Sequence, residues 1–410
     1  MRKPHVLIGI LVAAAYPPWG LGQESLSLQQ AVERALATHP LLAGSAERIA
    51  VSQGLRRQAA LRQNPRLTLQ TENWRPYATG DFQPSRDTDS FVYFSQLFET
   101  AGKRELRTDA AAEGVRLTEL ERDLVSRRIA ARVKLAFWRA AVAAKVHQLR
   151  LDNVRNFDQI VEFHEIRVRE GAMAEADLLR VRLESERLQV EANTAELEAD
   201  RGRILLLQEM GQTEFPRLVL TDKVEEVRPF VAGDAAQALE NRPEILIARQ
   251  VLNRSLAIEK LRRAESKPDV EASIGYKRTA GFNTMMGIVQ VPLPLIHRNQ
   301  GLIESASAEV RVARSEVAAL EALVRAEVAA AAANAAVRRR QVTETFRGLL
   351  DKALESSRIA QAAYREGGSD LLRLLDAERS RIEVQVLYYR TLAEYHEAEV
   401  TLEMAMGGTP

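Results

Sequence analysis

Few of the ionisable and metal-binding side chains in this chain of 410 residues are spaced for chemistry. The histidines lack the i, i+4 pairing of a zinc-binding helix, and His164-Glu165 is not followed by the second histidine of a zinc protease. Met285 and Met286 lie in a predicted strand, where packing or contact with lipid is a better interpretation than copper binding. Cysteine is absent, which excludes disulfides and thiolate metal sites. We therefore expect no catalytic residue, no metal ligand and no cofactor.

A different set of residues stands where two long helical patterns reverse direction. Gly171 ends the first pattern and Gly367-Gly368 ends the second, because glycine adopts the left-handed backbone that closes a helix. Asp177 and Asp370 follow, each at the start of a returning helix, where a carboxylate caps the free backbone N–H groups. The sequence therefore predicts two matched helical tips.

The second long pattern is unusually free of helix breakers. Between Gly301 and Gly367 there is no proline and only one glycine, Gly348. We predict an uninterrupted helix from Leu302 to Glu366, on the order of 100 Å long. Apolar residues follow a heptad rhythm along it, which is typical of helices packed side by side: Val310, Ala313, Val317, Leu320, Val324 and Ala331.

The whole layout occurs twice. Pro40 and Pro65 recur as Pro243 and Pro268, each 203 residues later, which indicates an internal repeat. We predict a signal peptide (1–22), a first repeat (23–211), a linker (212–234) and a second repeat (235–407). Each repeat is expected to hold a lead-in helix, a strand hairpin (about 66–98 and 270–293) and a long helix pair (about 103–211 and 300–407).

The N-terminus predicts export. Arg2 and Lys3 precede a short apolar run, and Gly20-Leu21-Gly22 is the preferred small-x-small cleavage site, with Ala13-Ala14-Ala15 as the other candidate. No stretch reaches the ~18 apolar residues of a membrane-spanning helix. The formal net charge is +1, so no overall field favours nucleic acid as a partner.

Four alternating segments predict strands that are long enough to cross a bilayer at a tilt. Four strands cannot close a barrel, and lipid does not tolerate an open sheet edge. Two chains would give a barrel filled by side chains, whereas three would give twelve strands around a lumen. A belt of aromatic residues is expected at the membrane surface, with packing of a small soluble sheet as the alternative: Trp74, Tyr77, Phe91, Tyr93, Phe94 and Phe98.

These features together resemble the TolC outer-membrane efflux channel family. The resemblance rests on the duplicated layout, the Ala-Leu-x-x-(His/Arg)-Pro lead-ins and the Gly-then-Asp-Leu-Leu tips. Pro292-Leu293-Pro294-Leu295 running into Arg298-Asn299-Gln300-Gly301 is most similar to the CzcC-like heavy-metal branch. Many CzcC-like and CusC-like members carry a lipidated cysteine, which this chain lacks, so membrane attachment would rest on the barrel alone.

The resemblance implies a mainly α fold with a small β part. Long coiled-coil-like helical hairpins and four strands per chain would form a homotrimer, with an α-barrel in the periplasm and a twelve-stranded transmembrane β-barrel. The barrel would lie in outer-membrane lipid. A periplasmic membrane fusion (adaptor) protein and an inner-membrane pump of the resistance-nodulation-division type would complete a tripartite exporter of heavy-metal cations. Drug export, type I protein export and a non-pore periplasmic coiled-coil protein are the alternatives.

The family also implies roles for residues near the tips. The tips meet the adaptor, Tyr364 matches a tyrosine that hydrogen-bonds across helix pairs to close the tunnel mouth, and Asp376 matches an acidic constriction. Three copies of Asp376 would favour cations, whereas a solvated helix face is the alternative interpretation. Two positions depart from the family pattern. Arg373 replaces a companion acid, and Ser369 replaces an arginine partner of the closing contact.

Overall fold

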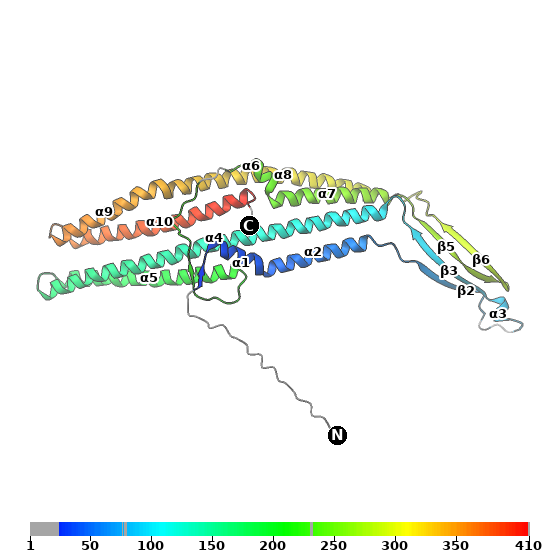
Figure 1. Ribbon diagram of the computed structural model, residues 1–410, viewed down its shortest axis with the longest axis horizontal. Coiled ribbons are helices and arrows are strands. Elements are labelled where there is room, and N and C mark those ends of the chain that lie inside the picture. Colours follow the sequence, from blue (N-terminus) through cyan, green and yellow to red (C-terminus); the bar gives the residue numbers. More distant parts are fainter. Residues whose placement is uncertain (1–23, 76, 78–79, 230–232, 409–410) are drawn as a thin grey trace, which may run out of the picture.

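Two helical runs extend along the whole helical part of the molecule, with a β-sheet at one end and two helix reversals at the other (Figure 1). The computed structural model describes residues 24–75, 77, 80–229 and 233–408, so the predicted signal peptide lies outside the described residues. The first run is a single helix, α4 (Lys103–Arg169). The second is divided into α8 (Gln300–Arg340), a π-helix (Gln341–Thr345) and α9 (Phe346–Arg365).

Shorter helices lie along each run and continue one another end to end (Figure 1). The returning helix α5 meets α2 beside α4, and α10 meets α7 beside α8 and α9. At the first of these joints, Gly211 (φ 76°) lies against His39, and at the second, Gly407 (φ 73°) lies against Arg242. These helices and their short lead-ins are α1 (Leu28–Thr38), α2 (Pro40–Ala59), α5 (Glu175–Glu209), α6 (Ala235–Asn241), α7 (Pro243–Ala264) and α10 (Leu371–Ala405).

The expected heptad face is confirmed, but the expected uninterrupted helix from Leu302 to Glu366 is wrong. Val310, Ala313, Val324 and Ala331 are buried or nearly so against neighbouring helices. At Gln341–Thr345 the helix widens into one π turn. No glycine or proline marks this segment, so the sequence carries no local signal. Packing selects it instead, because Val342 lies in a cluster with Leu392 and Tyr395 of α10.

Four antiparallel strands form one sheet in the order β2-β3-β5-β6. The two hairpins and the pairing of β3 with β5 between the repeats place four residues side by side across the sheet: Leu67, Phe94, Ile274 and Gly287. The strand predicted at 66–72 is confirmed. The strands are β2 (Arg66–Glu72), β3 (Asp89–Phe98), β5 (Val270–Thr279) and β6 (Phe282–Gln290).

The second hairpin begins at Val270 as predicted but differs from its prediction at the turn and at its C-terminal end. The sequence suggests a loop over 278–283 and a strand that ends at 293, but Ala280 and Gly281 form a two-residue turn and the strand ends at Gln290. Both turn residues have positive φ, 49° and 81°, as a tight hairpin turn requires. Beyond Gln290, Pro292 and Pro294 have no backbone N–H to donate, so the strand does not continue.

The linker between the repeats is part of the middle of the molecule. Its strand β4 (Leu218–Leu220) pairs in parallel with β1 (Glu24–Leu26), a pairing that the sequence did not suggest. The short helix α3 (Pro84–Asp87) lies in the first hairpin loop. Under the linker is the largest apolar cluster, in which fully buried side chains from α1, α4, α5 and β1 meet: Leu26, Ala31, Ala35, Ile129, Val133, Phe137 and Leu206.

Replacing Gly407 with alanine tests the end-to-end joint. A Cβ on Gly407 would lie 2.8 Å from the backbone nitrogen of Arg242, in a left-handed backbone that disfavours side chains. We expect Gly407→Ala to lower the free energy of unfolding by about 1–3 kcal/mol. Gly301→Ala is the control, since nothing lies within 4 Å of a Cβ on Gly301. Heat unfolding in detergent measures both, and equal midpoints would contradict the joint.

Candidate functional site

The two faces of the sheet differ in chemistry. On one face large apolar side chains are open to solvent, with Leu69 72% exposed and Val289 70% exposed. The opposite face is mostly polar and includes Thr68, Gln70 and the hydrogen-bonded pair Ser95–Ser273 at 2.8 Å. Strand register places these residues on the apolar face: Leu67, Leu69, Val92, Phe94, Phe98, Ile274, Tyr276, Met285 and Val289.

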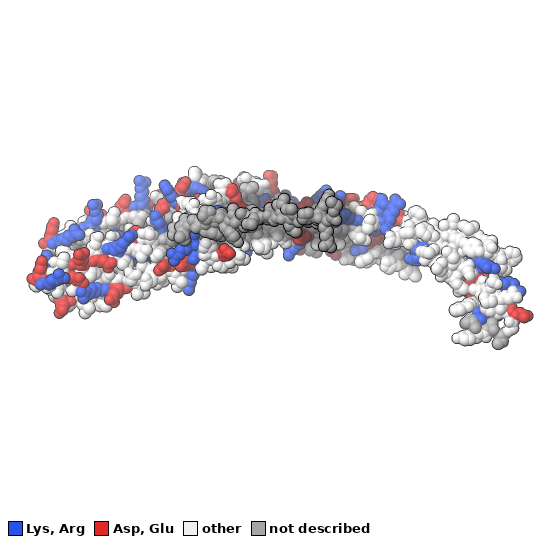
Figure 2. Space-filling model, turned by 60° about the horizontal axis from the view of Figure 1, so that its bottom comes forward, with Lys and Arg blue, Asp and Glu red and all other residues white. Residues whose placement is uncertain are grey.

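Charged residues are confined to the two ends of the strands. Arg66 and Glu271 lie at the helical end, 3.8 Å apart, and the others lie at the far end: Glu72, Asp89, Lys277 and Arg278. On the face shown in Figure 2, charged side chains cover the helices densely and the sheet sparsely. An exposed apolar face with an uncharged middle fits contact with the hydrocarbon core of a membrane.

The aromatic residues and methionines of the sheet divide between its faces. Phe94 and Phe98 lie on the apolar face, whereas Phe91 and Tyr93 lie on the other. Trp74 and Tyr77 are exposed beyond β2. Met285 and Met286 point to opposite faces, so they do not face one ligand together.

Both outer strands of the sheet have a free edge. Among the described residues, β2 pairs only with β3, and β6 pairs only with β5. A free edge presents unpaired N–H and C=O groups, which lipid does not satisfy. The sheet is therefore incomplete in a membrane unless another chain adds strands to both edges.

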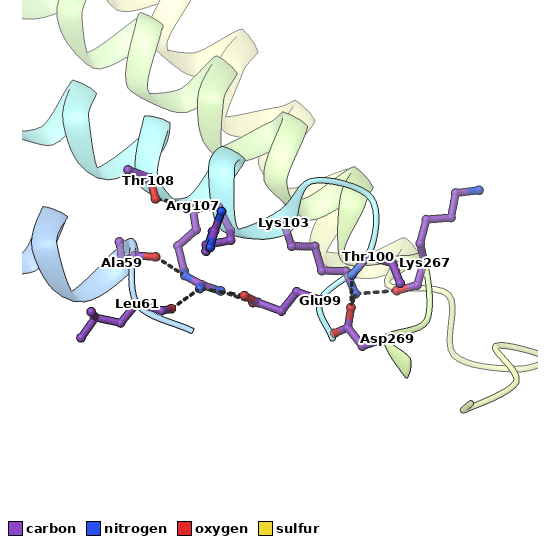
Figure 3. Close-up of polar contacts among 10 residues, drawn as sticks. Ala59, Leu61, Glu99, Thr100, Lys103, Arg107, Thr108, Lys267 and Asp269 are labelled. Atoms are coloured by element: carbon purple, nitrogen blue, oxygen red, sulfur yellow. Dashed lines mark hydrogen bonds and ion pairs between the residues drawn. The ribbon is translucent and has the colours of Figure 1, made fainter. Parts of the chain in front are cut away.

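A partly buried ion pair fixes the sheet to the start of α4 (Figure 3). The Lys103 ammonium donates to Asp269 at 2.7 Å and to the carbonyl of Lys267 at 2.6 Å. Asp269 also accepts the backbone N–H of Thr100 at 2.8 Å, and the Thr100 hydroxyl donates to Pro268. Because Lys103 and Thr100 belong to the first repeat and Asp269 to the second, the contact joins the repeats where sheet becomes helix.

Arg107 adds a second tie at the same junction (Figure 3). Its guanidinium pairs with Glu99 and donates to the carbonyls of Ala59, the last residue of α2, and of Leu61, which follows it. The bond with Glu99 raises the pKa of Arg107. In the second repeat, the residue at the start of α8 is Asn299, which has a φ of 59°. Its side-chain amide donates to the Arg262 carbonyl at 2.8 Å.

The two helix reversals have the same backbone geometry. Gly171 and Gly367 have φ of 71° and 75°, and the residue after each donates back to the helix, Ala172 to Arg167 and Gly368 to Ala363, both at 2.8 Å. This is the Schellman arrangement that a glycine at this position allows. Gly368 needs no positive φ. The space around Gly171 and Gly367 is open, so both tips are accessible.

Of the two predicted capping residues, one is confirmed and one is wrong. Asp370 caps α10 by accepting the backbone N–H of Arg373 at 2.8 Å. Ala174 is the N-cap of α5, and Asp177 lies inside the first turn. Burial, and after it the charge of Asp177, raises the pKa of Tyr364.

The structure adds a partner for Tyr364 that sequence reasoning missed. The Tyr364 hydroxyl on α9 lies 2.7 Å from Nε2 of His164 on α4, and His164 is fully buried. Tyr364 thus joins the two helix pairs. No motif or spacing in the sequence relates His164 to Tyr364, so only the folded structure reveals the contact.

Arg373 and Asp376 are both exposed on α10 among charges of both signs. Near them Arg379 makes a two-pronged contact with Glu184 of α5, which lowers the pKa of Glu184. These side chains line a hollow between α5 and α10. Its charged residues are four arginines and three acids: Arg180, Arg187, Arg373, Arg379, Glu184, Asp370 and Asp376. The surroundings of Asp376 are therefore mixed rather than acidic.

Glu378 forms a buried polar network that sequence reasoning also missed. Its carboxylate accepts from Ser357 at 2.5 Å and Gln361 at 2.6 Å on α9, and from Arg381 at 2.9 Å on α10. Arg381 continues to Asn153 of α4. The network holds three helices in one register above the tips, and the only sequence signal was a glutamate on an apolar helix face.

In the part of the chain that the structure describes, no three His, Asp or Glu side chains gather closely enough to hold a metal ion. A search of the same residues finds no helix with the length and hydrophobicity needed to span a bilayer.

Known proteins are similar to this chain in sequence and in fold. The model of the outer membrane efflux protein family matches residues 31–212 and 235–408. The cobalt-zinc-cadmium resistance protein CzcC of Cupriavidus metallidurans is 24% identical and is covered over 100% of its length, with 99% of this chain. The cation efflux system protein CusC of Escherichia coli is 26% identical over 82% of this chain and 74% of CusC. A crystal structure of CusC matches with a TM-score of 0.78 at 18% identity over 96% of each chain.

Lys103→Met tests the buried junction. The substitution keeps an apolar stem but leaves the Asp269 carboxylate without its counter-charge, so we expect a loss of about 2–4 kcal/mol in the free energy of unfolding. Arg104→Met is the matched control, because its partner Glu105 has a side chain that is 63% exposed, and such pairs contribute about 0–1 kcal/mol. Heat unfolding in detergent measures both, and a similar loss in the two variants would argue against the junction.

Proposed function

This chain belongs to the outer membrane efflux protein family, and we propose that it forms the exit duct of a tripartite exporter of heavy-metal cations. It is an outer-membrane efflux channel, with its helical part in the periplasm. The observation that carries the proposal is the sheet with one exposed apolar face, an uncharged middle and two free edges. The non-pore coiled-coil alternative gives such a sheet no role.

Three copies of the chain suit this sheet. Joining β6 of one copy to β2 of the next would pair both free edges, and three copies would supply twelve strands around a lumen. Two copies would supply eight strands, whose interior side chains fill the space. The paired helical runs, on the order of 100 Å long, would continue the lumen across the periplasm.

The cargo and the partners follow from the relatives. The name of CzcC specifies cobalt, zinc and cadmium, and that of CusC specifies cations. The sequence shows no motif for catalysis or for nucleotide binding. Transport energy would therefore come from an inner-membrane pump of the resistance-nodulation-division type. A periplasmic adaptor would bind the open tips, where the glycines and Asp370 are exposed and Asp177 is half-buried: Gly171, Gly367, Gly368, Asp177 and Asp370.

Purified protein tests the duct directly. We expect a detergent-solubilised trimer that conducts ions across a planar bilayer. Cells given this chain with its adaptor and pump should tolerate cobalt, zinc or cadmium at concentrations that arrest cells lacking only this chain. A monomer whose sheet is folded onto its own helices, with no conductance, would refute the proposal. Conductance without any change in metal tolerance would refute the cargo alone.

The charge at the proposed constriction is tested by opposite substitutions on one helix turn. Asp376→Asn removes a negative charge and Arg373→Gln removes a positive one, each in three copies. We expect cation preference, measured as reversal potential in a salt gradient, to fall in Asp376→Asn and to rise in Arg373→Gln, by about twofold in permeability ratio. Unchanged selectivity in both variants would place the two residues outside the conducting path.

A further inference from the structure

A cavity of about 650 Å³ lies between the two helix pairs, on the sheet side of the helix reversals. α4 of the first repeat forms one wall, and α9 and α10 of the second repeat form the other. The volume falls within the range of about 300–1,000 Å³ that is typical of small-molecule sites. The sheet on which the proposed duct depends lies at the opposite end of the molecule (Figure 1), so that function gives the cavity no role.

The floor of the cavity is apolar. Phe157 of α4 and Leu374 and Ile382 of α10 line it, and none of them is more than 4% exposed. Nearer the opening, Phe163 is 37% exposed and Leu354 is 49% exposed. A molecule in the cavity would remove these last two side chains from water, which favours a ligand with an aromatic or aliphatic body.

One buried donor at the cavity has no partner. Asn153 of α4 is 2% exposed, and its amide oxygen accepts from Arg381 at 3.2 Å. Because a guanidinium only donates, the oxygen must face Arg381 and the NH₂ group must point elsewhere. No described atom accepts from this nitrogen. A buried donor without a partner is unfavourable, so an acceptor on a bound molecule would satisfy it.

The charges around the cavity favour a negative group on that molecule. Among the described residues that line it, three are arginines and Glu378 is the one acid. The Glu378 carboxylate is already occupied by three protein donors. Arg358 of α9 is exposed at the edge of the cavity, and the acid nearest to it, Glu355, is 3.9 Å away. Arg358 is therefore available to an anion.

Asn153 and Arg358 lie at nearly the same level of the two helices. The contact between His164 and Tyr364 shows that a residue of α4 lies level with the residue of α9 that is 200 positions later. Arg358 is then five residues further along than Asn153, or about 7–8 Å along the helix axis. One carboxylate and the long arginine side chain can span this separation.

We propose that this cavity binds a small organic anion, with an aromatic or aliphatic body on the apolar floor and a carboxylate between Asn153 and Arg358. The bound molecule would contact α4 on one side and α9 and α10 on the other, so it would join the two helix pairs. The inference goes beyond the proposed duct and does not depend on conduction. A chain that binds the anion but does not conduct would keep this site and lose the proposed duct.

Binding of biphenyl-4-carboxylate to the purified full chain tests the site. Equilibrium dialysis against empty micelles of the same detergent measures the amount that the protein itself binds. We expect a dissociation constant below about 1 mM, as for other small ligands that fit their site. The neutral biphenyl-4-carboxamide should bind about tenfold more weakly, because it lacks the charge. If the chain binds no carboxylate at this concentration, the cavity holds water alone and the proposal is wrong.

Two substitutions locate the bound probe. Asn153→Asp keeps the oxygen that accepts from Arg381 but replaces the donor with a negative group, so we expect about tenfold weaker binding. Asn193→Asp makes the same change at an exposed position of α5 outside the cavity and should bind the probe like the unaltered chain. Unchanged binding in Asn153→Asp, or an equal loss in Asn193→Asp, would place the probe elsewhere and overturn the proposal.

Arg358→Gln changes an exposed side chain, so it tests the site even if Asn153→Asp does not fold. We expect about threefold weaker binding of the carboxylate, the size of effect that a partly exposed charge has, and no change for the carboxamide. Arg347→Gln, exposed on the same helix but outside the cavity, is the control and should leave both unchanged. Equal binding of carboxylate and carboxamide in the unaltered chain would overturn the assignment of an anion.

Discussion

The need to pair every backbone N–H and C=O in lipid is the constraint from which the rest of this structure follows. One chain supplies four strands with a hydrophobic face and leaves β2 and β6 each paired on one side. Water satisfies such edges, but hydrocarbon does not. Association is therefore part of folding for the proposed channel, because a single chain has nothing else among its described elements to cover both edges. The distribution of charge fits a membrane as well, because the middle of the sheet is uncharged and the charged residues lie at the strand ends.

The helical part meets a different requirement, which is to keep each long helical run packed against other helices along its whole length. A single helix packed along the whole of α4 would have to be as long as α4 and unbroken. The chain instead places α5 and α2 end to end, and does the same with α10 and α7 in the second repeat. Gly211 and Gly407 permit the close approach at the two joints. Each run is thereby covered by a partner along its length, and the linker packs over the joint region, where the largest apolar cluster lies.

Local signals in the sequence were strong wherever the backbone itself is unusual or periodic. The strand at Arg66–Glu72, the tip glycines Gly171 and Gly367, and the heptad face of α8 were all predicted because alternation, left-handed glycine and seven-residue spacing are properties of the chain alone. The failures came where packing overrides local preference. Ala280 adopts a positive φ without the usual asparagine, and Gln341–Thr345 forms a π turn without glycine or proline. The contacts near the tips could not be predicted for the same reason, because no spacing rule brings His164 to Tyr364 across 200 residues.

The charges around the tips limit what the mouth alone can select. Asp376 stands near Arg373 and Arg379, and Arg379 is itself bound to Glu184, so positive and negative groups alternate over a few helix turns. Mixed charges at such spacing cancel beyond about 10 Å, the screening distance in dilute salt. The charges on this surface of one chain therefore produce no strong net field of either sign. In the proposed channel, selection of cargo would then belong to the partner that delivers it. The hydrogen bond between Tyr364 and the fully buried His164 differs from these exposed ion pairs, because burial keeps it away from the screening salt.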